Sequence, residues 1–103
     1  MINYIKEWYQ NNNALNRTVE MFWRCFEAYS NEEPEEFKEV FPDGKKDTIL
    51  QFHRISYEID LPDFSQELIA IILDIYVCEK KVGWYKQLYL LNGEAFDEYF
   101  VID

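Results

Sequence analysis

The sequence has little cysteine, glycine or histidine, and each shortage argues against a class of site. Two cysteines, Cys25 and Cys78, are too few and too far apart for a disulfide framework or a zinc knuckle. The three glycines lack the spacing of a phosphate-binding loop. A single histidine, His53, argues against a histidine-based metal site, and the Asp-x-Asp-Gly pattern of calcium loops is missing. We therefore expect no cofactor and no bound metal.

Positive charge is also scarce. Ten Lys and Arg residues face twenty Asp and Glu residues, which gives a formal net charge of −10. Neither half of the chain is basic, so direct binding to nucleic acid or to an anionic membrane surface is disfavoured. An acidic chain of this kind is suited to solubility, or to attraction toward a partner with a basic surface.

Long apolar runs are missing as well. No stretch approaches the roughly 20 apolar residues that span a bilayer. The N-terminus lacks a cationic segment followed by an apolar one, so we expect a cytoplasmic protein. What the chain does have is 49% hydrophobic and 18% aromatic residues, enough to fold. Its 103 residues predict one domain, with a helical part at 1–41 and a sheet part at 48–103.

Three helical segments are predicted near the N-terminus. Residues 2–10 form a short helix, which the asparagine triplet at 11–13 ends. Residues 14–29 form the clearest helix, because apolar side chains recur there at alternating spacings of four and three. A third helix begins at Pro34, since proline suits the first helical turn, and runs to Phe41. The apolar stripe of the second helix consists of Leu15, Val19, Phe22, Phe26 and Tyr29.

The longest apolar run, Leu68–Cys78, is interpreted as a central strand. Its odd positions are all aliphatic and its even positions are mixed, which is typical of a sheet covered by helices on one side. A buried helix capped by Ser65 is the competing interpretation, but the β-branched content favours a strand. Residues 55–61 alternate as a half-buried strand does. Residues 48–54 fit either a helical turn capped by Asp47 or the start of a strand.

The C-terminal residues predict a hairpin around Asn92-Gly93, which is suited to a two-residue type I′ turn. Residues 79–81 are expected to form a loose polar turn before the strand at 82–91. The predicted fold is α+β: two or three N-terminal helices pack on one face of a four-stranded antiparallel β-meander. The hairpin pairs Tyr89 with Phe96, Gln87 with Glu98, Tyr85 with Phe100, Trp84 with Val101, and Lys86 with Tyr99.

Two groups of residues are candidates for binding a partner. The first is the densest acidic cluster in the chain, which is either a solvated helix face or a docking surface for a cationic partner. The second combines hairpin aromatics with carboxylates; most of these rings are core material, but exposed ones would suit a basic protein. The first group comprises Glu32, Glu33, Glu35, Glu36 and Glu39, and the second comprises Trp84, Tyr85, Asp97 and Glu98.

Asp74 is the residue least expected at its position, because a carboxylate inside a central strand needs a hydrogen bond, an ion pair or solvent. One interpretation is an open sheet face, where Asp74 lies beside Tyr76. The other is a candidate pocket at Asp74 and Tyr76 for binding or acid catalysis. His53 is interpreted as a surface or packing residue, since no sequence pattern around it marks a nucleophile.

The last residues, GWYKQLYLLNGEAFDEYFVID, resemble the ending of immunity proteins from polymorphic and contact-dependent toxin systems. In these proteins an aromatic strand with a leading glycine runs into a glycine turn, acidic residues and a final apolar strand. The resemblance implies a short, acidic, cytosolic protein that binds a cognate toxin and blocks its active site or substrate surface. It contains no diagnostic motif, so no functional residue is carried over. The order of elements is also similar to cystatin-like and nuclear-transport-factor-like folds.

We therefore expect a non-catalytic, acidic protein-binding module, namely an immunity protein or antitoxin that neutralises a cationic, nuclease-type toxin. Its partner would be a cognate protein toxin with a basic surface. Two alternatives remain open. One is a phage-type inhibitor that mimics nucleic acid, and the other is a small-molecule-binding or enzymatic cystatin-like domain that uses the sheet face around Asp74. The sequence does not fix the oligomeric state.

Overall fold

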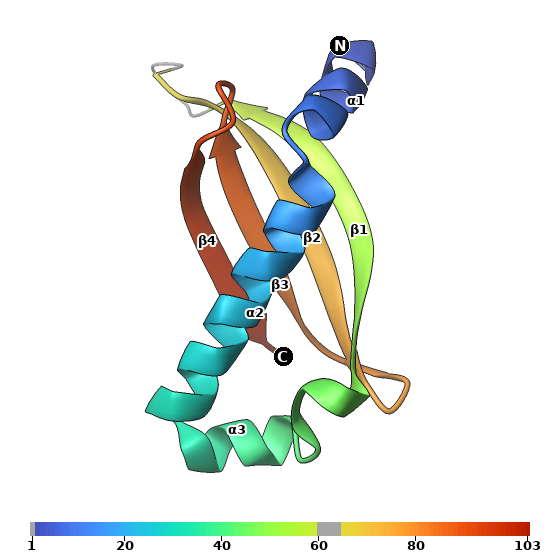
Figure 1. The fold of residues 1–103 in the computed structure, drawn as a ribbon, viewed down its shortest axis with the longest axis vertical. Coiled ribbons are helices and arrows are strands. Elements are labelled where there is room, and N and C mark those ends of the chain that lie inside the picture. Colours follow the sequence, from blue (N-terminus) through green and yellow to red (C-terminus); the bar gives the residue numbers. More distant parts are fainter. Residues whose placement is uncertain (1, 60–64) are drawn as a thin grey trace.

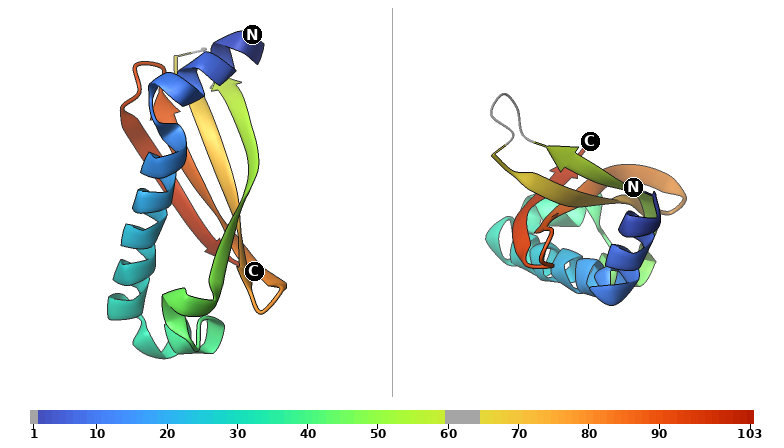
Figure 2. Two further views of the ribbon diagram at one scale, coloured as in Figure 1. Left: turned by 45° about the vertical axis from the view of Figure 1, so that its right-hand side comes forward. Right: turned by 90° about the horizontal axis from the view of Figure 1, so that it is seen from above.

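The computed structural model describes residues 2–59 and 65–103, in which helices precede a single antiparallel sheet. The helices all lie on one face of this sheet, here called the inner face, and leave the outer face uncovered (Figures 1 and 2). The predicted α+β fold, with helices followed by a four-stranded meander, is confirmed. The described elements are α1 (Ile2–Asn11), α2 (Ala14–Glu32), α3 (Pro34–Val40), a 3-10 helix (Gly44–Asp47), β1 (Thr48–Ile59), β2 (Glu67–Val77), β3 (Lys80–Leu90) and β4 (Ala95–Ile102), with strand order β1-β2-β3-β4.

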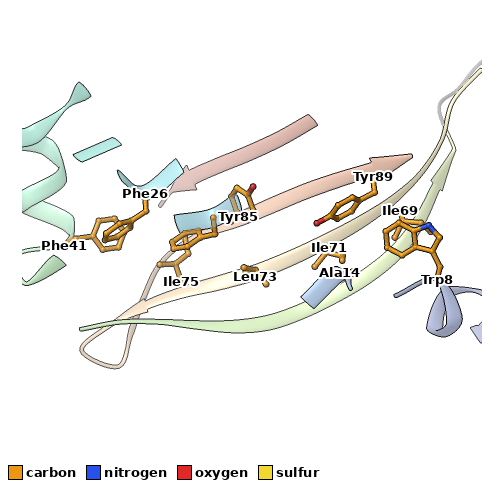
Figure 3. Close-up of a cluster of buried hydrophobic side chains, with 11 residues drawn as sticks. Trp8, Ala14, Phe26, Phe41, Ile69, Ile71, Leu73, Ile75, Tyr85 and Tyr89 are labelled. Carbon is orange, nitrogen blue, oxygen red and sulfur yellow. The ribbon is translucent and has the colours of Figure 1, made fainter. Parts of the chain in front are cut away.

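The central run is a strand, and its odd positions face the helices as predicted. Four of these side chains are fully buried and form the middle of the core that Figure 3 shows, and Val77 is partly buried. Burying each such aliphatic side chain contributes roughly 1.5–3 kcal/mol, so this row supplies a large share of the stability. Trp8 closes one end of the core, where its indole N–H donates to the Leu91 carbonyl at 2.9 Å. The buried odd positions are Ile69, Ile71, Leu73 and Ile75.

The first turns of α2 differ from the predicted stripe. Leu15 is 44% exposed, whereas Ala14 and Thr18 are fully buried beside Phe22 and Phe26. The small Ala14 side chain lets the helix approach the sheet, and the Thr18 hydroxyl lies 2.7 Å from the Tyr89 hydroxyl. This hydrogen bond satisfies two buried polar groups, so the core accommodates a threonine at this position with little loss of stability.

Strand β1 begins at Thr48, so residues 48–54 are strand and not a helical turn. Pairing with β2 decides this, because the register runs from Thr48 opposite Val77 to Ile59 opposite Glu67. The ladder is interrupted once, where the pairing shifts between Phe52 and Arg54. His53 is the additional residue, so it forms a β-bulge. The predicted end of this strand at Leu61 lies outside the described residues.

The turn at Asn92-Gly93 is one residue longer than predicted. The Gly93 N–H donates to the Leu90 carbonyl at 2.9 Å, and the Leu90 N–H donates to the Glu94 carbonyl at 2.8 Å. Leu91, Asn92 and Gly93 therefore form a three-residue loop in which Gly93 takes the positive φ of +95°. The prediction of a two-residue type I′ turn was wrong.

A second irregularity restores the predicted register beyond that loop. Tyr89 pairs with Ala95 and not with Phe96, but Leu88 pairs with Asp97, so Phe96 is bulged out of the ladder. The longer loop shifts the pairing by one residue and the bulge shifts it back. The remaining predicted pairs are confirmed: Gln87 with Glu98, Tyr85 with Phe100, Trp84 with Val101, and Lys86 with Tyr99.

The two-residue turn lies instead between β2 and β3, at Cys78 and Glu79. Val77 pairs directly with Lys80, and both turn residues have positive φ, +50° and +67°. A type I′ turn requires this backbone, which asparagine and glycine adopt at low cost. This backbone conformation is unfavourable for cysteine and glutamate, and neither residue type indicates a turn in the sequence.

We predict that the double substitution Cys78→Asn, Glu79→Gly stabilises the protein by about 1–2 kcal/mol, because it relieves two unfavourable backbone conformations. The melting temperature should rise by roughly 4–8 °C for each kcal/mol. Thermal unfolding followed by circular dichroism measures the change. Cys78→Ser retains the conformational cost and serves as the control. An unchanged melting temperature in the double variant would contradict the assignment of strain to this turn.

Candidate functional site

The five clustered glutamates form an exposed corner where α2 meets α3. Glu33 ends α2 and also precedes the first turn of α3, and its N–H donates to the Tyr29 carbonyl at 2.9 Å. Pro34 follows at the first helical position, where it cannot continue α2 and suits the start of α3. Glu35 and Glu36 lie in the first turn of α3, where carboxylates favour the helix N-terminus. The acidic corner comprises Glu32, Glu33, Glu35, Glu36 and Glu39, all exposed.

A groove of about 410 Å³, here called the corner groove, lies beside the acidic corner. Glu32 and Glu36 contribute its carboxylates, and Tyr29 and Phe100 contribute aromatic rings whose centroids are 5.7 Å apart. Sequence reasoning did not place Phe100 here, because it comes from β4 and meets α2 only in the folded chain. The remaining lining residues are Cys25, Ala28 and Ile102.

The Tyr29 hydroxyl lies buried in this groove. Among the described residues it has no hydrogen-bond partner within bonding geometry. Burial, with the nearby carboxylate of Glu36 as a smaller cause, raises the pKa of Tyr29 to about 12. The phenol therefore stays protonated at neutral pH, beside the Glu36 carboxylate.

A second groove of about 360 Å³ is lined by residues of α2, β3 and β4, among them Glu98. Oε1 of Glu98 accepts a hydrogen bond from the Cys25 thiol at 3.0 Å and lies 2.5 Å from the Tyr85 hydroxyl. Burial, followed by the Glu98 carboxylate, raises the pKa of Cys25 to about 12. Cys25 is thus a protonated thiol, which lacks the reactivity of a catalytic thiolate. The second groove is lined by Met21, Arg24, Gln87 and residues 95–98.

The predicted hairpin patch divides between two faces of the sheet. Tyr85 and Glu98 belong to the inner face, where Tyr85 is fully buried and leaves a partner no surface to contact. Trp84 pairs with Val101 and Asp97 pairs with Leu88, both on the outer face. Neighbouring residues in a strand point to opposite faces, so Trp84 and Tyr85 cannot join one patch. Of the four predicted residues, Glu98 accepts a hydrogen bond from Cys25, which lines the corner groove.

Asp74 lies on the outer face, at the base of a groove of about 260 Å³ that we call the outer groove. The residue is 8% exposed, and its carboxylate is paired on both oxygens. Oδ2 lies 2.9 Å from Nδ1 of His53, and Oδ1 lies 3.5 Å from Nζ of Lys81. Tyr76 does not line the groove, so the predicted pairing of Asp74 with Tyr76 is replaced by a cluster of Asp74, His53 and Lys81.

The sequence does contain a signal for this cluster. Apolar residues of β1 fall on even positions at Leu50 and Phe52, and then on odd positions at Ile55 and Tyr57. Such a change of phase within one strand indicates a bulge, because one extra residue exchanges the faces. His53 lies at that point; it is exposed, which fits its interpretation as a surface or packing residue, and it also contacts Asp74.

The described residues provide no metal site and no serine or cysteine hydrogen-bonded to His53. None of their His, Cys, Asp and Glu side chains form a group of three that could hold a metal ion. The hydrogen bonds of His53 within the described chain go to Asp74 and Arg54, neither of which is a nucleophile of the serine or cysteine type. No described helix has the length and apolar character needed to cross a membrane.

Comparison of the chain with protein-family models, with curated proteins and with solved structures found no match.

Proposed function

We propose that this protein is a non-catalytic binding module that captures a basic protein surface at its acidic corner. In this role it acts as an immunity protein that neutralises a cationic toxin. The observation that carries the proposal is the corner groove, where two carboxylates border a partly aromatic cavity beside three further glutamates.

The chemistry of the corner groove suits the side chain of a lysine or an arginine. Glu32 and Glu36 supply charge-assisted acceptors, and Tyr29 and Phe100 supply ring surface for the aliphatic stem and for cation–π contact. A fully desolvated cation of this kind is typical of the few residues that dominate an interface.

Electrostatics favours a basic partner over a neutral one. The net charge of −10 attracts cationic proteins over a distance of about one Debye length, roughly 8 Å at physiological salt. Within residues 32–39 the five glutamates are accompanied by one cation, Lys38. A nuclease surface is basic because its substrate is anionic, so an acidic inhibitor gains both association rate and specificity against it.

Charge reversal at the groove provides the test. The double substitution Glu32→Lys, Glu36→Lys should weaken binding at least about tenfold, since it replaces two attractive contacts with repulsive ones. The partner would be the basic protein that the wild-type chain captures from its native host. Its affinity is measured by calorimetry at about 50 and 300 mM NaCl, where screening should reduce the difference between the variants.

Glu7→Lys, Glu20→Lys is the matched control, because it changes the net charge equally at exposed sites away from the corner. Binding should remain within about twofold of wild type in this control. The captured protein is then co-expressed in bacteria with either the wild-type chain or the corner variant. Only the wild-type chain should protect the cells. Equal binding by the corner variant and the control, or no protection by the wild type, would refute the proposal.

A further inference from the structure

The outer groove collects positive charge on a strongly acidic chain. Three of the ten Lys and Arg residues line it together with the only histidine, against one carboxylate. It lies on the uncovered face of the sheet, opposite the helices, so it is separate from the corner groove. The cations are Arg54, Lys81 and Lys86, and the carboxylate is Asp74.

Two β-bulges bring these charged side chains together at the outer groove. The bulge at His53 places His53 and Arg54 on the same face, because Arg54 pairs with the outer-face residue Ile72 while His53 reaches Asp74. On the other side of Asp74, the pairing of β2 with β3 shifts at Val82, which brings Lys81 opposite Tyr76 on the outer face. Bulges redirect side chains and are frequent beside functional sites. Here β1 and β3, the two neighbours of β2, each have a bulge close to Asp74.

Hydrogen bonding fixes the orientation of the cluster. Arg54 Nη2 lies 3.3 Å from Nε2 of His53, and a guanidinium can only donate, so Nε2 is the acceptor. On its other side the His53 ring faces Asp74, with Nδ1 2.9 Å from Oδ2. Lys81 is paired with Asp74 and Lys86 with Glu58. Within the described chain Arg54 has no carboxylate partner, although its guanidinium carries five donors.

We propose that the outer groove binds a small organic oxyanion, a carboxylate or a phosphate, that carries a planar ring. Arg54 and Lys86 bind the oxyanion, Asp74 positions His53 and Lys81 around it, and the half-buried ring of Trp84 provides a stacking surface. The volume of about 260 Å³ lies below the roughly 300–1,000 Å³ typical of drug-sized ligands, which favours a compact molecule.

Four probes separate the contributions of anion and ring. Phenyl phosphate and benzoate carry both, inorganic phosphate lacks the ring, and benzyl alcohol lacks the charge. Each is titrated into the ¹⁵N-labelled full chain, and the affinity is taken from amide and indole shifts. We expect the outer-face residues of β1 and β3 to shift, and the better of the two ring anions to bind at least about tenfold more tightly than benzyl alcohol. The stronger of phenyl phosphate and benzoate identifies the oxyanion.

Three variants test the assignment of residues. Arg54→Ala should weaken ring-anion binding at least about tenfold, because a hydrogen bond to a charged group is lost. Trp84→Leu should weaken the binding of phenyl phosphate but leave the binding of inorganic phosphate unchanged. Lys38→Ala removes an exposed cation on α3 and should bind as wild type does. No shifts with either ring anion at about 10 mM, or equal losses in the Arg54 and Lys38 variants, would overturn the proposal.

Discussion

Replacing Phe22 with alanine is expected to lower the free energy of unfolding by about 3–5 kcal/mol. Phe22 is fully buried at the point where α2 meets the sheet. Its ring stacks on Phe100 with centroids 5.4 Å apart and meets the edge of Tyr85 at 5.6 Å. Alanine would remove this contact between helix and sheet and leave a cavity that rigid aromatic neighbours cannot fill.

Urea unfolding followed by tryptophan fluorescence measures this loss. Since small domains have total stabilities of roughly 5–15 kcal/mol, the variant should be close to unfolding at room temperature. Leu15→Ala, at a 44% exposed position on the same helix, should change stability by less than about 0.5 kcal/mol. Similar losses in both variants would show that Phe22 does not hold the helix to the sheet.

Replacing Gly83 with alanine is expected to cost about 3 kcal/mol or more, because β3 and β4 approach too closely for a side chain there. A Cβ atom at this position would lie 2.1 Å from the Val101 carbonyl oxygen, which belongs to the backbone and cannot rotate away. The two strands must separate locally to accept it. We therefore expect the amide signals of β4 near Val101 to shift or broaden.

Gly44→Ala provides the comparison for Gly83→Ala. Gly44 has a positive φ of +63°, but no atom lies within 4 Å of a Cβ placed there. Its substitution should cost only the conformational penalty of about 1–2 kcal/mol. A Gly83 variant that unfolds no more easily than the Gly44 variant would mean that the β3–β4 contact can relax. Both are measured by urea unfolding under the same conditions.

Most of the sheet could be predicted from alternation alone, because one face of each central strand is buried. In β2 the odd positions are aliphatic and pack against helices, so pattern and burial agree. The turns could not be predicted in the same way. Asn92-Gly93 suits a type I′ turn but forms part of a longer loop, while Cys78 and Glu79 adopt positive φ without any favourable residue type. Pairing along the strands outweighs local turn preference there.

The candidate sites were only partly predictable for a related reason. The acidic corner is contiguous in sequence, so its charge was visible, but the corner groove needs Phe100 from β4. The outer groove depends on bulges that bring His53 and Lys81 to Asp74 from different strands. Sequence reasoning identified Asp74 as unusual, because a carboxylate in a central strand needs partners, but it did not identify those partners.

The bulges at His53 and Phe96 have a further consequence for the behaviour of many copies in solution. These two residues lie in β1 and β4, which are the edge strands of the sheet. A regular edge presents unpaired N–H and C=O groups that a strand of another molecule can extend, which is how edge-to-edge aggregation begins. An extra residue in each edge strand breaks that regular row. We therefore expect both edges of the sheet to pair less readily with a strand of another molecule than regular edges would.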